Sequence, residues 1–411
     1  PAVIVSFLVA GAICACAALA YAEVATMIPA SGSAYTYSYV VLGEIFAWVV
    51  GWSLILEYSL VVSAVAVGWA GYATGFIASL GMPIPLALAA GPYAGGVLNL
   101  PAMAIIAVVA GLLMAGTRES ATINAALVIV KIVALLIFIA VALPHFNAAA
   151  YHPFMPYGFA AHADGDVKRG VMAAAAIIFF AFYGFDAIST AGEETKNPGR
   201  DLPIGIVGSM FICTLLYIAV AGVAVGSMPF TEYAHSAEPL ALILRKLGSG
   251  GVAVVIGAAA IIALPTVILA FLYGQSRIFF VMARDGLLPT KLALVNVRTG
   301  TPVRITVVTA IIVAVLAGLV PLAQIAALAN AGTLLAFAAV AICMLVLRRR
   351  APEQKRIFRS PLPWLVGPGA ILGCLYLFSS LSQRTQIFFL CWNIFGFAYY
   401  LVWKFRGDKA G

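Results

Sequence analysis

The stretch VMAAAAIIFFAFYGFDAISTAGEE, residues 171–194, decides the fold of this chain. An apolar run of this length can cross about 30 Å of hydrocarbon as a helix, which takes about 20 residues. Gly184 stands among aromatic residues halfway along. Glycine permits the helix to break there but is also common in unbroken membrane helices, so the residues alone leave both a broken and an unbroken helix open. A break exposes free carbonyl and N–H groups that together bind small zwitterions, and Asp186 would cap the second half-helix.

The rest of the chain is apolar in the same way. Of its 411 residues, 64% are hydrophobic and 9% are charged, and the mean hydropathy is +1.08. In a soluble domain about a quarter of the residues are charged, so a water-soluble enzyme, a secreted domain and a disordered chain are excluded. The net charge of +8 does not indicate a nucleic-acid partner, because most basic residues lie in short gaps between apolar runs. We predict a polytopic membrane protein embedded in the lipid bilayer.

Eleven apolar runs are long enough to cross the membrane, and none shows the strict alternation of a β-barrel strand. The predicted fold class is therefore all-α. The runs are 1–22, 38–76, 100–116, 121–144, 171–194, 203–228, 250–283, 302–321, 323–347, 362–382 and 386–404.

Basic residues predict the orientation of these helices. In alternate gaps they concentrate on one side, which carries the cluster 348–350 and the C-terminal Lys404, Arg406 and Lys409. By the positive-inside rule this side and the C-terminus are cytoplasmic, and we expect a multi-pass protein of the cytoplasmic membrane. All four histidines fall in outer loops, and the six cysteines lie in apolar runs without metal-ligand spacing. We therefore predict no metal, no cofactor and no histidine proton relay.

Two ionisable side chains stand near the middle of apolar runs, where charges are rare and usually functional. Glu57 is surrounded by small residues within GWSLILEYSLVVSAVAVGWAGY, residues 51–72, and belongs either to a binding site or to a hydrogen-bonded structural contact. Lys131 is at least ten residues from either end of its run, too far to snorkel to the surface. It is a candidate proton carrier, because burial favours the neutral amine. A permanent charge in place of a bound cation and a structural ion pair are the alternatives.

A proline interrupts the run 250–283. Pro265, followed by Thr266, has no N–H group and frees a backbone carbonyl of the preceding turn. We expect another group to bond that carbonyl. Glu44, near the cytoplasmic end of the run 38–76, is expected to be solvated.

Four segments in this order resemble the signatures of the cationic amino acid transporters, a family of the amino acid–polyamine–organocation superfamily. They are PASGSAYTYSY (29–39), GWSLILEYSLVVSAVAVGW (51–69), FFAFYGFDAISTAGEETKNPGRDLPIGI (179–206) and YGQSRIFFVMARDGLLP (273–289). A weaker likeness continues through FRSPLPW (358–364) to the C-terminus, so the resemblance covers essentially the whole chain.

The resemblance implies a single transmembrane domain over residues 1–411, built from two inverted five-helix repeats and two C-terminal helices. Residues 1–144 would hold the remainder of the first repeat, 171–347 the second repeat and 362–411 the two extra helices. The broken segment is the fifth run of this chain, whereas the repeat needs five complete helices before it. We therefore expect the family's other broken helix, its first, to be missing, leaving 11 of 12 helices, and the start at Pro1 without a Met agrees.

The resemblance also implies a substrate site. The backbone carbonyls of Phe180, Ala181 and Tyr183 would hold the α-ammonium of an amino acid, and Phe185 matches an aromatic gate over the site. Glu57 matches a carboxylate that reaches the substrate through water.

A coupling site follows from the same likeness. Lys131 matches a lysine whose amine replaces a sodium ion between the family's first and eighth helices, with Thr266 as its neighbour on the latter. Asp186 is expected to support the break between the half-helices.

The predicted function is secondary active transport of amino acids by alternating access, sodium-independent and either proton-linked or by exchange. The alternatives are a non-transporting amino acid sensor and an inactive truncated permease. The sequence contains no zincin, nucleophile-elbow or other catalytic motif, which argues against an enzyme. The substrate side chain, cationic or small and neutral, and the oligomeric state are left open.

Overall fold

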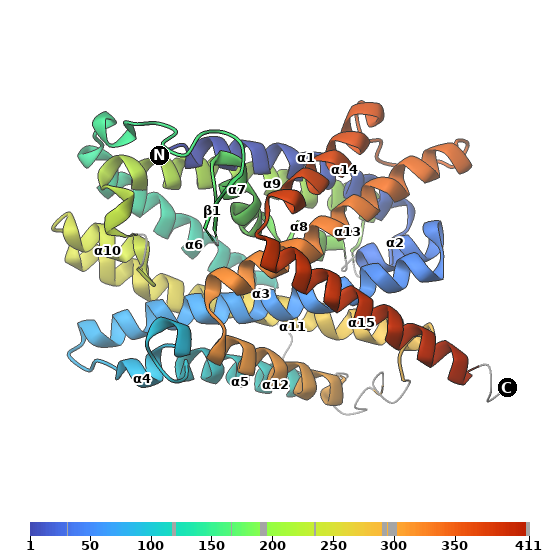
Figure 1. Ribbon diagram of the computed structural model, residues 1–411, viewed down its shortest axis with the longest axis horizontal. Helices are drawn as coiled ribbons and strands as arrows, with labels where there is room; N and C mark the ends of the chain where they lie inside the picture. Colours follow the sequence, from blue (N-terminus) through green and yellow to red (C-terminus); the bar gives the residue numbers. More distant parts are fainter. Residues whose placement is uncertain are drawn as a thin grey trace.

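The computed structural model describes residues 1–30, 32–116, 121–165, 167–189, 195–233, 236–289, 294 and 302–407. Long helices run along the longest axis of the molecule, and the start of the first helix and the end of the last lie at opposite ends of it (Figure 1).

In chain order the helices and strands are α1 (Val3–Met27), α2 (Ser33–Leu42), α3 (Glu44–Ser79), α4 (Leu86–Ala89), α5 (Leu100–Met114), α6 (Ala121–Ala142), β1 (His162–Asp164), β2 (Val167–Arg169), α7 (Val171–Ile178), α8 (Phe185–Ser189), α9 (Pro198–Ser227), α10 (Pro239–Lys246), α11 (Gly250–Arg284), α12 (Val303–Leu319), α13 (Leu322–Arg350), α14 (Pro363–Ser380) and α15 (Gln383–Gly407). Short 3-10 helices lie at Pro92–Ala94, Leu143–His145, Ala148–Tyr151, Phe179–Phe182 and Phe230–Glu232.

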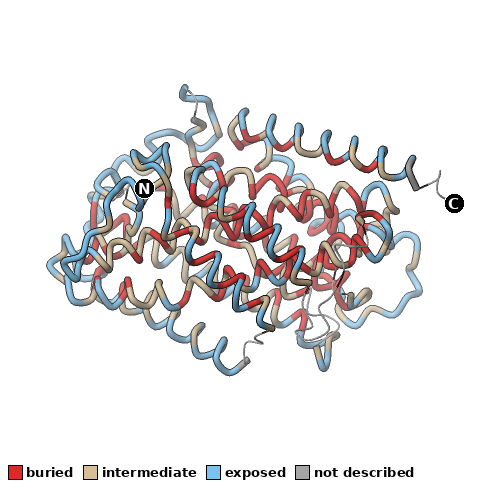
Figure 2. The backbone as a smooth tube through the Cα atoms, turned by 90° about the horizontal axis from the view of Figure 1, so that it is seen from below, coloured by how far each residue is buried: buried red, intermediate tan, exposed pale blue. Residues whose placement is uncertain are grey.

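Helices α3 and α13 form the interior of the bundle. In their most apolar windows 78% and 72% of the residues are buried, against 11% for α9 and for the span that contains α6. α3 packs against α11, α13, α12 and α5, and α1 packs against α9. Buried residues accordingly gather in the middle of the bundle, while the outer helices turn exposed residues outward (Figure 2). The exposed side chains of these outer helices include Ile129, Phe211 and Phe388, as a lipid-facing surface requires.

The eleven predicted runs all form helices, so the all-α polytopic fold is confirmed. Within the described residues, nine helices are long and apolar enough to cross a membrane, and α5 and α12 are shorter apolar helices. The run predicted at 171–194 is described as far as Ser189.

The predicted start of the run 38–76 is wrong. The chain breaks at Gly43, where φ is +97°, so that residues 38–42 belong to α2 and α3 begins at Glu44. Positive φ favours glycine because it has no Cβ. Glu44 is 37% exposed and accepts hydrogen bonds from the Tyr400 hydroxyl (2.5 Å) and Lys404 Nζ (2.9 Å), in agreement with a solvated position at the rim.

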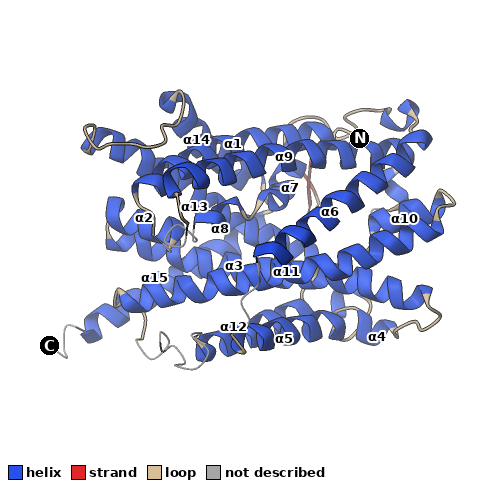
Figure 3. Cartoon of the chain, turned by 180° about the vertical axis from the view of Figure 1, so that it is seen from behind, coloured by secondary structure: helices blue, strands red, loops and turns tan. Residues whose placement is uncertain are grey.

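A two-stranded antiparallel hairpin interrupts the long connection before α7. In its register His162 pairs with Arg169 and Ala163 with Lys168. The hairpin is the small strand element in the otherwise helical view of Figure 3. It leads directly into Val171, the first residue of the half-helix α7.

Candidate functional site

The predicted break in the helix at Gly184 is confirmed. α7 ends at Ile178, a 3-10 turn covers Phe179–Phe182, and α8 begins at Phe185. Gly184 has a φ of +113°, a conformation that residues with a Cβ rarely adopt. Nothing lies within 4 Å of the position that its Cβ would occupy. The backbone conformation, rather than lack of space, therefore favours glycine here.

Asp186 lies in the first turn of α8 and connects the break to α3. Its Oδ1 accepts the N–H of Gly184 at 3.1 Å, and its Oδ2 accepts the hydroxyl of Tyr58 on α3 at 3.2 Å. The Ser189 hydroxyl donates to the Asp186 carbonyl at 2.6 Å. With an exposed fraction of 1%, Asp186 satisfies an N–H group at the break from the second helical position, two residues beyond the position of a conventional cap.

Glu57 precedes Tyr58 on α3 and lies against α13. It is 0% exposed, and neither carboxylate oxygen has a hydrogen-bond partner among the described residues. A Cβ on Gly332 of α13 would lie 3.1 Å from the Glu57 Cβ and 3.0 Å from the Ser53 carbonyl oxygen, so the two helices are in direct contact. Burying an ionised carboxylate without a partner is costly, and Glu57 is therefore suited to accept a proton or a cationic ligand.

The remaining predicted substrate residues lie immediately before and after Gly184. The Phe180 carbonyl accepts the Tyr183 N–H at 3.4 Å, and Ala181 lies between them in the chain. Phe185 packs against Phe337 of α13, with ring centroids 4.8 Å apart, and edge-on against Tyr21 of α1, with centroids 5.7 Å apart. The aromatic residue predicted as a gate is thus buried between α1 and α13.

Asn330 of α13 belongs to this site and is absent from the sequence-based prediction. It is 0% exposed, and its Nδ2 donates to the carbonyls of Ala176 (2.7 Å) and Ile177 (3.1 Å). Its Oδ1 accepts the hydroxyl of Tyr183. The signal in the sequence is an asparagine inside the apolar segment AALANAGTLL, residues 326–335, because a polar amide at membrane depth needs partners.

Lys131 and Thr266 lie in direct contact where α6 packs against α11. The Lys131 Nζ donates to the Thr266 Oγ1 at 2.8 Å, and the Thr266 hydroxyl donates to the Ala263 carbonyl at 2.8 Å. The structure thus places next to each other the two residues that the resemblance paired.

The carbonyl released by Pro265 has a partner from another helix. Pro265 lies inside α11 and cannot donate to the carbonyl of Ile261, four residues earlier. The indole Nε1 of Trp69 on α3 donates to that carbonyl at 2.9 Å. Trp69 therefore ties the proline turn of α11, one residue before Thr266, to α3.

The predicted site residues form two groups. Tyr183, Phe185 and Asp186 lie at the break and are contacted from α1, α3 and α13, and Glu57 lies at the contact of α3 with α13. The pair of Lys131 and Thr266 lies at the α6–α11 contact, and α3 contributes to both groups. Across the described residues, no group of three or more His, Cys, Asp or Glu side chains could hold a metal ion.

A cavity of about 160 Å³ adjoins the break. One wall is the segment from Ala181 to Ile188, and the other is α9. Among the described residues its lining carries no charged side chain, and the α9 residues in it are Ser209, Met210, Cys213 and Tyr217.

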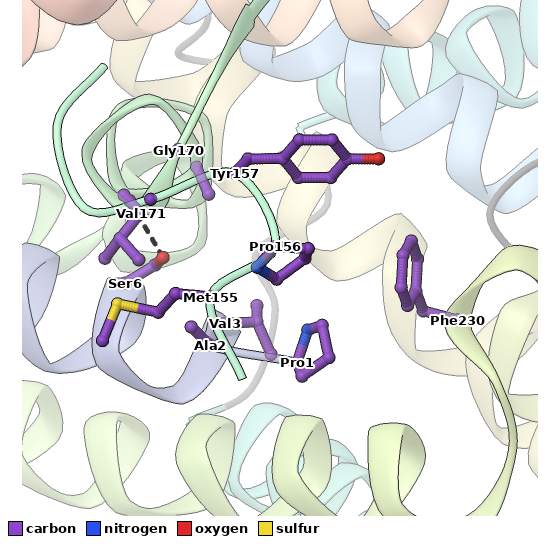
Figure 4. A pocket seen from close by; sticks show the side chains of 12 residues that line it. Pro1, Ala2, Val3, Ser6, Met155, Pro156, Tyr157, Gly170, Val171 and Phe230 are labelled. Atoms are coloured by element: carbon purple, nitrogen blue, oxygen red, sulfur yellow. Dashed lines mark hydrogen bonds between the residues drawn. The ribbon is translucent and has the colours of Figure 1, made fainter. Parts of the chain in front are cut away.

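A second cavity, of about 170 Å³, contains none of the predicted site residues. Figure 4 shows it between the start of α1, the loop around Pro156 and Phe230. At its edge the Ser6 hydroxyl donates to the Val171 carbonyl at 2.9 Å, which fixes the start of α7 on α1.

Comparison with known proteins gives consistent matches over the whole chain. The family model described as amino acid permease matches residues 1–400. A branched-chain amino acid permease of Bacillus subtilis is 43% identical, with 100% of this chain and 87% of the relative covered. A methylthioribose transporter of the same organism is 42% identical over 98% of this chain and 86% of its own length. The vacuolar cationic amino acid transporter 4 of Arabidopsis thaliana is 37% identical over 86% of this chain and 58% of its own length.

Proposed function

The chain belongs to the amino acid permease family and is an amino acid transporter, and we propose that it carries its substrate by alternating access around the break between α7 and α8. The observation that carries this proposal is the break itself, buried between α1, α3 and α13 beside the carboxylates of Glu57 and Asp186. Broken helices in transporters place their open ends at the substrate, and rocking of the surrounding helices exposes it to either side. The substrate is released unchanged, so no catalytic residue is required.

In this proposal the carbonyls of Phe180, Ala181 and Tyr183 accept the α-ammonium of the substrate. They lie at the end of the first half-helix, which carries the negative end of the helix dipole. Phe185 closes over the bound substrate from the second half-helix. Glu57 contributes a carboxylate that reaches the substrate through water.

We further propose that Lys131 carries the coupled proton. Its contact with Thr266 across the α6–α11 interface would form or break as the amine changes charge, and a ligand shifts a conformational equilibrium only through such differential contacts. Lys131→Ala in the full-length protein is expected to abolish amino acid uptake driven by a pH gradient in liposomes. Lys404→Ala, at the rim of α15, is the matched control and should retain it.

The outcomes of this experiment separate the alternatives. Undiminished proton-driven uptake by Lys131→Ala would refute the role of the lysine. Wild-type uptake that is indifferent to a pH gradient but stimulated by amino acid on the opposite side would indicate exchange. Amino acid binding without any flux would indicate a sensor.

We propose a neutral aliphatic amino acid as the substrate. The described residues that line the cavity beside the break are uncharged, and the Bacillus subtilis relative named as a branched-chain permease shares 43% identity with this chain. A cationic amino acid is the second candidate, because the buried carboxylate of Glu57 has no hydrogen-bond partner among the described residues and the plant relatives are named as cationic transporters. Competition of labelled leucine uptake by arginine tests the choice: strong competition by arginine would overturn the neutral assignment.

The orientation and the repeats complete the proposal. The basic cluster Arg348–Arg350 ends α13, and by the positive-inside rule this end and the C-terminus face the cytoplasm. Residues 1–144 and 171–347 would form the two repeats and 362–411 the extra helices. Labelling of a C-terminal tag by an impermeant reagent in intact cells would contradict the orientation.

A further inference from the structure

Asn330 uses every hydrogen-bonding group of its side-chain amide on the broken helix. Nδ2 has two hydrogens, and they reach the Ala176 and Ile177 carbonyls; Oδ1 accepts the Tyr183 hydroxyl. The opposite orientation of the amide would place an oxygen against two carbonyls, so only one orientation satisfies all three contacts. The side chain is 0% exposed, and water does not compete for these bonds.

The two carbonyls that Asn330 bonds belong to the last turn of α7. The final carbonyls of a helix lack the i+4 partner of its interior, and in the membrane interior polar backbone groups need partners. The Ile177 carbonyl also accepts the Phe179 N–H, so Asn330 adds a second bond to it. Ala176 and Ile177 precede the 3-10 turn at Phe179–Phe182. Asn330 bonds both of their carbonyls, and the carbonyls proposed for the ammonium, at Phe180, Ala181 and Tyr183, follow them in the chain. The Phe180 carbonyl also accepts the Tyr183 N–H.

The position of Asn330 is itself fixed by α3. Two residues further along α13, Gly332 packs so closely on α3 that a Cβ would lie 3.0 Å from the Ser53 carbonyl oxygen. α13 therefore cannot rotate or slide without losing this contact. A rigid path runs from α3 through α13 to the end of α7.

We propose that Asn330 is a positioning residue that holds the end of α7 in the geometry that selects an α-ammonium. This inference rests on the proposed function of the break, and it adds a residue from outside the broken helix. Asn330 does not touch the substrate; it determines where the carbonyls of residues 180–183 point. Its loss should therefore weaken recognition of the ammonium group much more than recognition of the rest of the substrate.

The test compares ligands with and without the ammonium group. Leucine uptake is measured in proteoliposomes, and 4-methylpentanoate, which is leucine without its amine, is measured as an inhibitor of that uptake. If the protein carries arginine, the pair is arginine and 5-guanidinopentanoate. In Asn330→Leu the KM for the amino acid should rise about tenfold or more, because that is the effect of losing a hydrogen-bonded contact. The inhibition constant of the deaminated acid should stay within about twofold of its wild-type value, because this ligand has no ammonium group for the carbonyls to bind.

Two further variants keep the test informative. Tyr183→Phe removes one donor to Asn330 and leaves both carbonyl bonds, so it should raise KM less than Asn330→Leu does. Asn393→Leu on α15 is the matched control, because that amide bonds the Phe389 carbonyl of its own helix and the Ser53 hydroxyl; its KM should be unchanged. If Asn330→Leu does not fold, a KM for Tyr183→Phe equal to that of the wild type overturns the proposal.

Either an unchanged KM in Asn330→Leu or an equal loss of affinity for both ligands would overturn the positioning role. A wild-type protein that takes up neither amino acid would instead contradict the proposed function of the break. The two failures are therefore distinguishable in one series of measurements.

Discussion

Replacing Glu23 by glutamine should destabilise the protein more than any comparable change of an exposed carboxylate. Glu23 on α1 is 1% exposed and accepts Arg348 Nε at 2.8 Å, Arg348 Nη2 at 2.5 Å and the Ser360 N–H at 2.8 Å. Arg356 Nε lies 3.3 Å from its Oε1. One buried carboxylate thus joins α1, the end of α13 and the segment that leads into α14.

The magnitude follows from what the substitution leaves behind. Glutamine keeps the shape but removes the negative charge, and Arg356, with a side chain only 5% exposed, loses its counter-charge. Removing one partner of a buried ion pair costs about 3–5 kcal/mol, because the other charge remains desolvated. Arg348 is 23% exposed and is partly compensated by solvent, so we expect a loss near the lower limit, about 3 kcal/mol.

Equilibrium unfolding in detergent micelles, followed by tryptophan fluorescence, measures this loss. Glu44→Gln is the control, because Glu44 is likewise paired with a basic residue, Lys404, and accepts the Tyr400 hydroxyl, but its side chain is 37% exposed. An exposed pair contributes about 0–1 kcal/mol, so this variant should lose no more than that. Replacing Glu23, Arg348 and Arg356 together by methionine should recover most of the stability. Equal losses for Glu23→Gln and Glu44→Gln would refute the reasoning, and so would a triple variant less stable than Glu23→Gln.

Two further predictions concern the backbone of the site. Trp69→Phe leaves the Ile261 carbonyl without its donor and should lower the free energy of unfolding by about 1–3 kcal/mol. Adding Pro265→Ala to Trp69→Phe restores a helical N–H group and should recover most of this loss. If the double variant recovers no stability, the indole acts through packing alone. Gly184→Ala forces a Cβ into a φ of +113° at a cost of about 1–3 kcal/mol and should raise KM for the amino acid. Gly43→Ala, at a φ of +97° outside the site, should lower stability to a similar extent and leave KM unchanged. If both variants raise KM, the effect of Gly184→Ala is not specific to the break.

The sequence predicts the membrane-spanning helices well because the lipid imposes a local requirement. Every span needs about 20 apolar residues in a row, and this requirement is readable without knowledge of the neighbours. The break at Gly184 is only partly readable in the sequence, because glycine permits a positive φ but is also common in unbroken membrane helices. The family resemblance is what predicts it. The start of α3 was misplaced because apolar residues continue across Gly43, and a break in direction leaves the hydropathy unchanged.

The polar contacts between helices were much harder to predict. Lys131 and Thr266 were paired through a family resemblance, because a spacing of 135 residues carries no local signal. Asn330 and its carbonyl partners are 154 and 153 residues apart, and Glu23 and Arg348 are 325 apart. The sequence shows that each of these polar residues needs a partner in an apolar environment, whereas only the packing of the helices decides which partner it has.

Helix α13 joins the break to the Glu23 network, and this limits how the transporter can move. Asn330 bonds the end of α7 and Arg348 bonds Glu23 on α1, eighteen residues or about 27 Å apart along the same helix. If α13 rocked by about 10° around its contact with α7, within the range of known rigid-body rotations, Arg348 would shift by about 5 Å. Such a shift exceeds the tolerance of a hydrogen bond. Either α1 must therefore move together with the end of α13, or the carboxylate of Glu23 must separate from Arg348 during the cycle. A charge buried as deeply as Glu23 opposes separation, so the expected motion keeps α1 together with the end of α13.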